Sequence, residues 1–155
     1  MLAPMSEAGL GSDIYFALAA LAWADGFLND EDAEAIARVA EYDGLDPNSL
    51  ARIKSRIRRP VTLDSIDLAR LAIEDRLFVY AVASWMTRLD GAVSRHESQV
   101  LAEVASMLSL TPQECDRARV EALEVATSSG RRPKDYDFVT LRQRLGQPQS
   151  IRPRV

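Results

Sequence analysis

A short stretch that occurs twice decides the fold, ADGFLNDED at residues 24–32 and LDGAVSRHE at residues 89–97. A shift of 65 positions superimposes the two without a gap, and the match continues on both sides. The coinciding identical residues include Tyr15/Tyr80, Asp25/Asp90, Gly26/Gly91, Ala37/Ala102, Val39/Val104, Ala40/Ala105, Leu45/Leu110 and Pro47/Pro112. Unrelated apolar helices would not also align an Asp-Gly pair and a proline. The sequence therefore predicts an internal duplication.

Each copy is expected to form three helices, from about residue 12 to 59 and from about 75 to 128. Glycine supplies the left-handed residue that stops the first helix at Gly26 and at Gly91. The second helix begins at a capping residue followed three positions later by an acid, and the third begins at a proline. Residues 63–73 are expected to link the copies as a short helix.

The predicted fold class is all-α, with six or seven helices arranged as a duplicated three-helix unit with pseudo-two-fold symmetry. The apolar stretches 14–24 and 77–89 carry almost no charge, so they are expected at the centre. We expect a flexible N-terminus at 1–11, a helical domain at 12–129 and a basic, mostly irregular tail at 130–155. Within that tail, Tyr136–Leu145 is expected to form a helical turn or two, and the rest is expected to be disordered.

Charge is unevenly distributed along the 155 residues, whose net charge is −4. Residues 130–155 carry seven basic and two acidic groups, which leaves −9 on residues 1–129. The segment 52–59 holds five basic and no acidic residues. An acidic body without aromatic residues among the basic ones argues against nucleic-acid binding. The basic segments predict partner contacts through Arg52, Arg56, Arg59, Arg131 and Arg132.

Catalytic and export signals are absent from the sequence. It holds one histidine and one cysteine, and no phosphate-binding, zinc-binding or nucleophile motif. We therefore expect a protein that is not an enzyme. A single thiol and no recognisable export signal favour the cytoplasm.

The two corners have a structural and a functional interpretation. Glycine and the capping residues account for most of the motif without any ligand. Asp25 and Asp90, however, each end a helix, where the helix dipole disfavours an anion by about 0.3–1 kcal/mol. A metal ion, an arginine or backbone N–H groups could compensate that charge. Oxygen ligands alone predict a hard cation, Ca²⁺ or Mg²⁺, held by Asp25 and Asp32 with Asp90 and Glu97.

These paired stretches resemble the motif of the tellurite-resistance TerB-like family, to which domains of some membrane-anchored J-domain co-chaperones are related. The resemblance covers about residues 12–128. It implies a duplicated helical domain that is not an enzyme, binds a divalent cation through acidic residues and acts in stress resistance or membrane-proximal assemblies. Asp25 and Asp90 match the motif aspartates, and Asp32 and Glu97 match the acids that follow. The chain departs from the family where Asp32 replaces a glutamate and where Arg88, Arg95 and His96 surround the second corner.

Three functions remain open at this stage. The first is a stress-related, cation-binding TerB-like domain, and the second is a metal-independent protein-interaction module whose corners are only helix caps. The third is a small metal-dependent enzyme. Protein partners are expected, with peripheral membrane association through the basic tail and homodimer formation left open.

Overall fold

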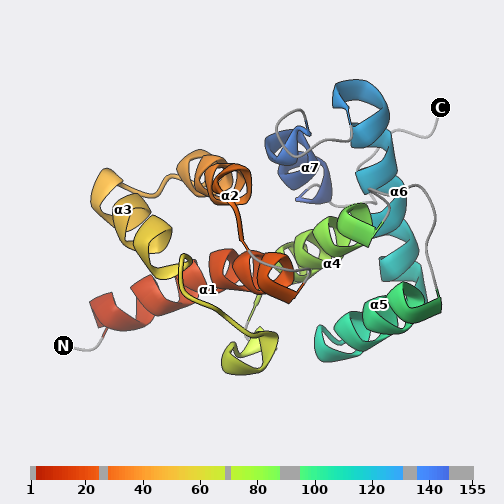
Figure 1. Cartoon of the computed structure of the whole chain (residues 1–155), viewed down its shortest axis with the longest axis horizontal. Helices are drawn as coiled ribbons and strands as arrows, with labels where there is room; N and C mark the ends of the chain where they lie inside the picture. Colours follow the sequence, from red (N-terminus) through yellow and green to blue (C-terminus); the bar gives the residue numbers. More distant parts are fainter. Residues whose placement is uncertain (1–2, 25–27, 69–70, 88–94, 131–135, 147–155) are drawn as a thin grey trace.

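The computed structural model describes residues 3–24, 28–68, 71–87, 95–130 and 136–146, without the side chains of residues 3–12, 24, 65, 87 and 95–97. Within these ranges the chain is helical and contains no strand, as predicted (Figure 1). The elements are α1 (Ala3–Ala24), α2 (Asp30–Tyr42), α3 (Pro47–Arg56), the 3₁₀ turn η1 (Leu63–Ser65), α4 (Ile73–Thr87), α5 (Arg95–Met107), α6 (Pro112–Ser129) and α7 (Phe138–Leu145).

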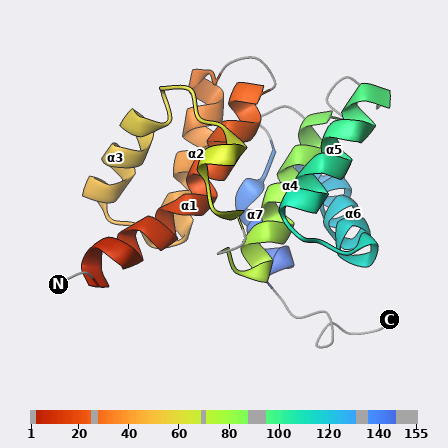
Figure 2. The same cartoon turned by 90° about the horizontal axis from the view of Figure 1, so that it is seen from below.

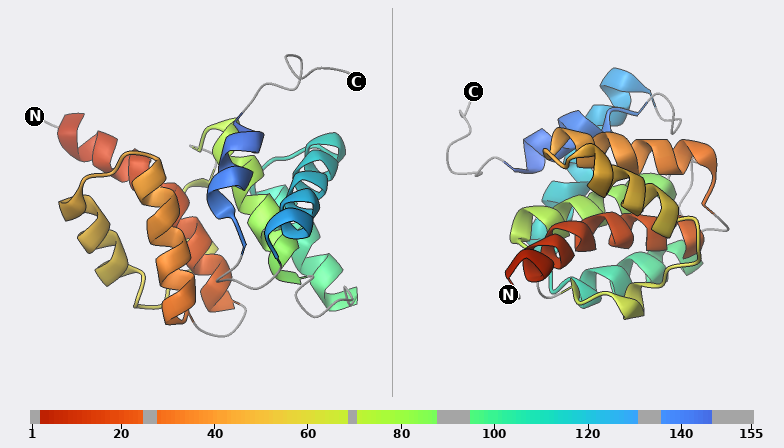
Figure 3. Two further views of the ribbon diagram at one scale, coloured as in Figure 1. Left: turned by 90° about the horizontal axis from the view of Figure 1, so that it is seen from above. Right: turned by 90° about the vertical axis from the view of Figure 1, so that its left-hand side faces the viewer.

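Helices α1 and α4 form the centre of the molecule, which confirms the expectation for the two apolar stretches. They contact each other, and most of their residues within 14–22 and 77–85 are buried. Helices α2 and α3 pack on the α1 side, whereas α5 and α6 pack on the α4 side (Figures 1 and 2). Helix α7 contacts α2, α4 and α6, so it lies between the two groups (Figure 3).

The N-terminus differs from the expectation of a flexible segment at 1–11 and a helix capped by Ser12. Helix α1 already begins at Ala3. Alanine, methionine, glutamate and leucine between residues 3 and 10 favour a helix, and Pro4 falls in the first turn, where proline is tolerated.

The prediction of a short helix at residues 63–73 was also wrong in part. Among the described residues of 63–72, Leu63–Ser65 form η1, the backbone N–H of Ile66 donates to Leu63 and that of Leu71 donates to Leu68, and α4 begins at Ile73.

The helical turns expected within residues 136–145 are present as α7, but the assignment of this segment to a tail outside the helical domain was wrong, because it belongs to the core. Tyr136, Phe138, Leu141 and Leu145 are all buried. The rings of Tyr136 and Phe138 lie 4.9 and 5.0 Å from that of Trp85 on α4. Aromatic side chains bury large areas, so packing fixes a helix whose own sequence signal is weak.

Helix boundaries repeat with the same offset as the sequence. Helix α5 begins and ends 65 positions after α2, and the prolines that open α3 and α6 are also 65 apart. The packing of the third helices differs between the copies. Helix α6 packs along α4 in the most extensive helix pair of the fold, whereas α3 contacts α2 more than it contacts α1.

The ends of α2 and α5 share a C-terminal cap. Gly44 and Ser109 occupy equivalent positions and both have positive φ, +97° and +56°. The amide after each of them donates to a carbonyl five residues earlier, from Leu45 to Ala40 at 3.1 Å and from Leu110 to Ala105 at 3.0 Å. This is the hydrogen bond of a Schellman cap, for which glycine is the favoured left-handed residue. In the second copy a serine occupies that position.

We expect Ser109→Gly to stabilise the protein by about 0.5–1 kcal/mol. The left-handed conformation costs an L-residue about 1–2 kcal/mol, and the larger loss of backbone entropy by glycine offsets part of the gain. Urea unfolding measures the difference. Ser106→Gly, within the same helix, is the matched control and should destabilise by about 0.5 kcal/mol, since serine lies between alanine and glycine in helix propensity. Equal destabilisation by both substitutions would contradict the assigned cap.

Candidate cation site at the helix corners

The start of α2 forms the capping box that the sequence predicts. The Asn29 side chain accepts a hydrogen bond from the backbone N–H of Asp32 at 2.8 Å. In return, Oδ2 of Asp32 accepts from the backbone N–H of Asn29 at 3.1 Å. The box satisfies two of the N–H groups that a helix start leaves without a partner. The box uses Oδ2 of Asp32, and among the described residues Oδ1 accepts no hydrogen bond.

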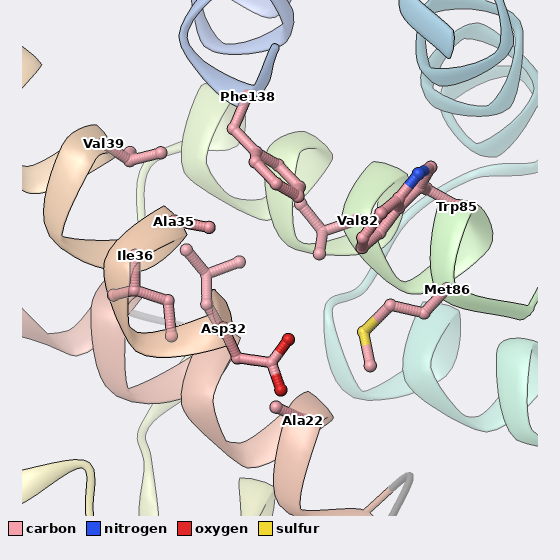
Figure 4. A pocket seen from close by; sticks show the side chains of 10 residues that line it. Ala22, Asp32, Ala35, Ile36, Val39, Val82, Trp85, Met86 and Phe138 are labelled. Carbon is pink, nitrogen blue, oxygen red and sulfur yellow. The ribbon is translucent and has the colours of Figure 1, made fainter. Parts of the chain in front are cut away.

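The Asp32 carboxylate points into a cavity of about 40 Å³ between α1, α2, α4 and α7 (Figure 4). Among the described residues, all other side chains that line it are apolar or aromatic, namely Leu18, Ala22, Ala35, Ile36, Val39, Val82, Trp85, Met86 and Phe138. Pockets for drug-sized ligands start at about 300 Å³. The cavity therefore has room for a few water molecules or an ion, and not for an organic ligand of that size.

This environment raises the pKa of Asp32 above its ordinary value. Burial is the main cause, because an apolar wall cannot replace the water around a charged carboxylate. The hydrogen bond from Asn29 acts in the opposite direction, and the neighbouring Glu31 adds to the increase. At neutral pH the corner therefore holds a carboxylate that a positive charge would stabilise.

We expect Asp32→Asn to stabilise the protein at neutral pH in the presence of a chelator. Its amide oxygen can still accept from Asn29, and the variant buries no charge. Because the pKa of Asp32 is raised by folding, wild type gains stability as the pH falls through the folded-state pKa. The advantage of the variant should thus disappear in acid, as thermal unfolding across pH will show. A variant that is less stable at neutral pH would contradict the burial cost.

The other predicted metal ligands cannot be placed. Asp25 and Asp90 lie outside the described residues, and Glu97 is described only as part of the first turn of α5. Among the side chains that the structure does describe, no three acidic, histidine or cysteine residues come together as a metal cluster. Asp32 is thus the only one of the four whose surroundings are known.

The basic residues of 52–59 divide into two groups. Lys54 and Arg58 form ion pairs with acids of α2, to Glu34 at 3.4 Å and to Asp30 at 2.7 Å. Arg56 lies over the ring of Phe16, 5.3 Å from its centroid. The predicted contact residues Arg52, Arg56 and Arg59 are exposed. Arg131 and Arg132, the other two, lie outside the described residues.

Two arginines of the predicted tail are committed to internal ion pairs. Arg142 binds Asp43 at 3.1 Å and Asp75 at 2.5 Å, with its side chain 15 % exposed. Arg144 pairs with Glu121 at 2.5 Å, and Glu121 is buried. These pairs join α7 to α2, α4 and α6. Arg142 and Arg144 are therefore not available to bind a membrane or a partner, and the tail carries less free positive charge than its sequence suggests.

A buried tyrosine extends the Arg142 network into α1. The hydroxyl of Tyr15 donates to Asp43 at 2.5 Å, and burial together with this bond raises the pKa of Tyr15. Burial lowers the pKa of Arg142, but Asp43 and Asp75 more than offset that effect and raise it. Sequence reasoning missed this network. One feature of the sequence could have indicated the network. Asp43 lies at the C-terminal end of a helix, where the helix dipole disfavours a negative charge and a positive partner is expected.

Neither a search for membrane-spanning helices nor comparison with known proteins identifies a function for these residues. In the part of the chain that the structure describes, no helix is both long and apolar enough for a membrane span. No protein-family model, curated protein or solved structure matches the chain.

Proposed function

We propose that this chain is a duplicated helical domain of the TerB-like kind, not an enzyme, that binds Ca²⁺ or Mg²⁺ at its paired acidic corners. In this proposal it acts in the cytoplasm as an interaction module of a stress-response assembly. One observation carries the cation site. A single cavity is lined by Ala22 near the end of α1, Asp32 at the start of α2 and Met86 near the end of α4.

The two Asp-Gly pairs follow these cavity residues closely in the chain. Asp25 comes three residues after Ala22, and Asp90 comes four residues after Met86. One residue spans at most about 3.6 Å, so each aspartate lies a short distance along the chain from a residue that lines this cavity. Asp32 already points its carboxylate into the cavity (Figure 4). The proposed ligands Asp25, Asp32, Asp90 and Glu97 would then serve one shared site.

Electrostatics supports a cation at Asp32. Among the described residues no hydrogen bond to Oδ1 is present, and a carboxylate oxygen is a hard ligand of the kind that Ca²⁺ and Mg²⁺ take. Burial raises the pKa of Asp32, because the apolar wall stabilises the charged carboxylate poorly. A bound cation would supply that charge, and the apolar wall would strengthen the attraction.

The duplication supports the assignment of equivalent roles to the two corners. Helix boundaries and the C-terminal caps of α2 and α5 recur at the offset of 65. We infer that one ancestral three-helix unit accounts for both halves. The different packing of α3 and α6 is then a later divergence.

Thermal unfolding of metal-stripped protein tests the cation site. Millimolar Ca²⁺ or Mg²⁺ at about 100 times its dissociation constant adds about 2.7 kcal/mol, or about 5–10 °C in Tm for a chain of this size. Asp25→Asn/Asp90→Asn should lose this shift. Glu41→Gln/Glu103→Gln removes two exposed acids of α2 and α5 and should keep it. A shift that both variants lose would mean general charge screening and would refute the site.

The second candidate is a metal-independent interaction module with the same fold. The complete capping box favours it, because the side chains of Asn29 and Asp32 each accept a hydrogen bond from the other's backbone N–H and so explain the corner as a helix cap. In that case neither cation shifts the Tm of wild type. A small metal-dependent enzyme would need turnover in addition to the cation shift.

A further inference from the structure

We propose that Arg52, Arg56 and Arg59 form a docking surface for an acidic segment of a partner protein. We call these three residues the arginine face. The arginine face lies on α3 and just after it, and its proposed role does not depend on the cation site.

Helix geometry separates the arginine face from the other basic residues of α3. Ile53 and Ile57 are buried and mark the side of α3 that faces the core. At about 100° per residue, Lys54 and Arg58 lie on one flank of this buried side, and the arginine face lies on the opposite flank. The first flank turns to α2 and is neutralised there by Glu34 and Asp30.

Among the described residues, no acid forms an ion pair with Arg52, Arg56 or Arg59. The guanidinium of Arg56 lies over the ring of Phe16 instead. The stacking restricts the Arg56 guanidinium before any partner arrives. Arg59 continues the same flank just past the end of α3, where its backbone N–H donates to the carbonyl of Arg56 at 3.2 Å. The fold thus presents three positive groups in a partly fixed arrangement.

The chemistry of this face favours a carboxylate partner over a membrane or nucleic acid. Membrane-surface helices need an exposed apolar face, but the apolar side of α3 is buried and none of the large exposed apolar residues lies on α3. Three arginines contact few phosphates, and the acidic body repels a polyanion that extends beyond them. Guanidinium groups bind carboxylates through paired hydrogen bonds. Arg52 and Arg56 are four residues apart, which matches glutamates spaced i, i+4 on a helix.

Fluorescence anisotropy with a labelled decaglutamate peptide in metal-free, low-salt buffer tests this surface. Wild type should bind the peptide, and binding should weaken as salt is added. Arg52→Gln/Arg56→Gln/Arg59→Gln should lose about tenfold or more in affinity. If this variant does not fold, Arg52→Gln/Arg59→Gln keeps the stacked Arg56 and should still lose several-fold.

Lys54→Gln/Arg58→Gln is the matched control, because it removes positive charge from the flank that α2 already neutralises. It should retain most of the affinity. An equal loss in both variants would show unspecific attraction and overturn the proposal. Tighter binding to phosphatidylserine vesicles or to a short DNA duplex than to the peptide would overturn the choice of a protein partner. Absence of peptide binding by folded wild type would overturn the surface itself.

Discussion

Truncation of the chain after Gly130 is expected to abolish cooperative unfolding. The truncated protein would lose the four buried side chains of the C-terminal segment, Tyr136, Phe138, Leu141 and Leu145. Replacing a single buried leucine or phenylalanine by alanine costs about 2–5 kcal/mol. For four such side chains the loss is about 8–20 kcal/mol, as large as the total stability of about 5–15 kcal/mol that a domain of this kind has. Circular dichroism during heating should then show a gradual loss of helix instead of a transition.

Two control proteins test whether the effect is due to the loss of α7. Truncation after Gly146 keeps all four side chains and both ion-paired arginines, so a cooperative transition should remain. Full-length Phe138→Ala should unfold cooperatively with a loss of about 3–5 kcal/mol. If the chain that ends at Gly130 unfolds as cooperatively as full-length protein, α7 is not part of the core.

Arg142→Ala is expected to destabilise the domain by about 3 kcal/mol. The Arg142 side chain is 15 % exposed and compensates two carboxylates, of which Asp43 is 17 % and Asp75 25 % exposed. Removal of one member of a buried ion pair leaves the other charges without compensation, which costs more than the pair itself contributes. The guanidinium also lies over the ring of Phe78, 5.3 Å from its centroid. Urea unfolding measures the loss.

An exposed ion pair provides the control for this effect. Lys54 on α3 pairs with Glu34 on α2, and both side chains are exposed. Lys54→Ala should cost less than about 1 kcal/mol. A double-mutant cycle between Arg142→Ala and Asp75→Ala should show a clear coupling energy. Equal costs for Arg142→Ala and Lys54→Ala would contradict the role of Arg142 in joining α7 to α2 and α4.

Local signals explain which parts of the fold could be predicted. Caps and helix stops depend on a few neighbouring residues, so Asn29 with Asp32, Thr111 with Glu114, and Gly44 appear where the sequence indicates them. The apolar stretches of α1 and α4 likewise predict their central position. The repeat adds a second, independent copy of each signal, which is why the helix order could be derived without the structure.

The sequence predicted a short helix within residues 136–145, but not its packing into the core, because that packing depends on residues far away in the sequence. The surplus of basic residues in 130–155 favoured an exposed tail instead. The partners of α7 are Asp43, Asp75 and Glu121, which no local pattern links to Arg142 or Arg144. The apolar cavity beside Asp32 could not be predicted for the same reason. Residues from four helices line it, so the sequence identified Asp32 as a candidate ligand but did not predict its apolar surroundings.

Terbium luminescence tests the proposed cation site most directly. Tb³⁺ takes the same oxygen ligands as Ca²⁺ and emits when a nearby tryptophan is excited. Trp85 lines the cavity into which Asp32 points. The proposal predicts tryptophan-sensitised emission that saturates with Tb³⁺, falls when Ca²⁺ competes and is absent in Asp25→Asn/Asp90→Asn. Emission that is absent in folded wild type, or equally strong in that variant, would contradict a cation at the corners and leave them as helix caps.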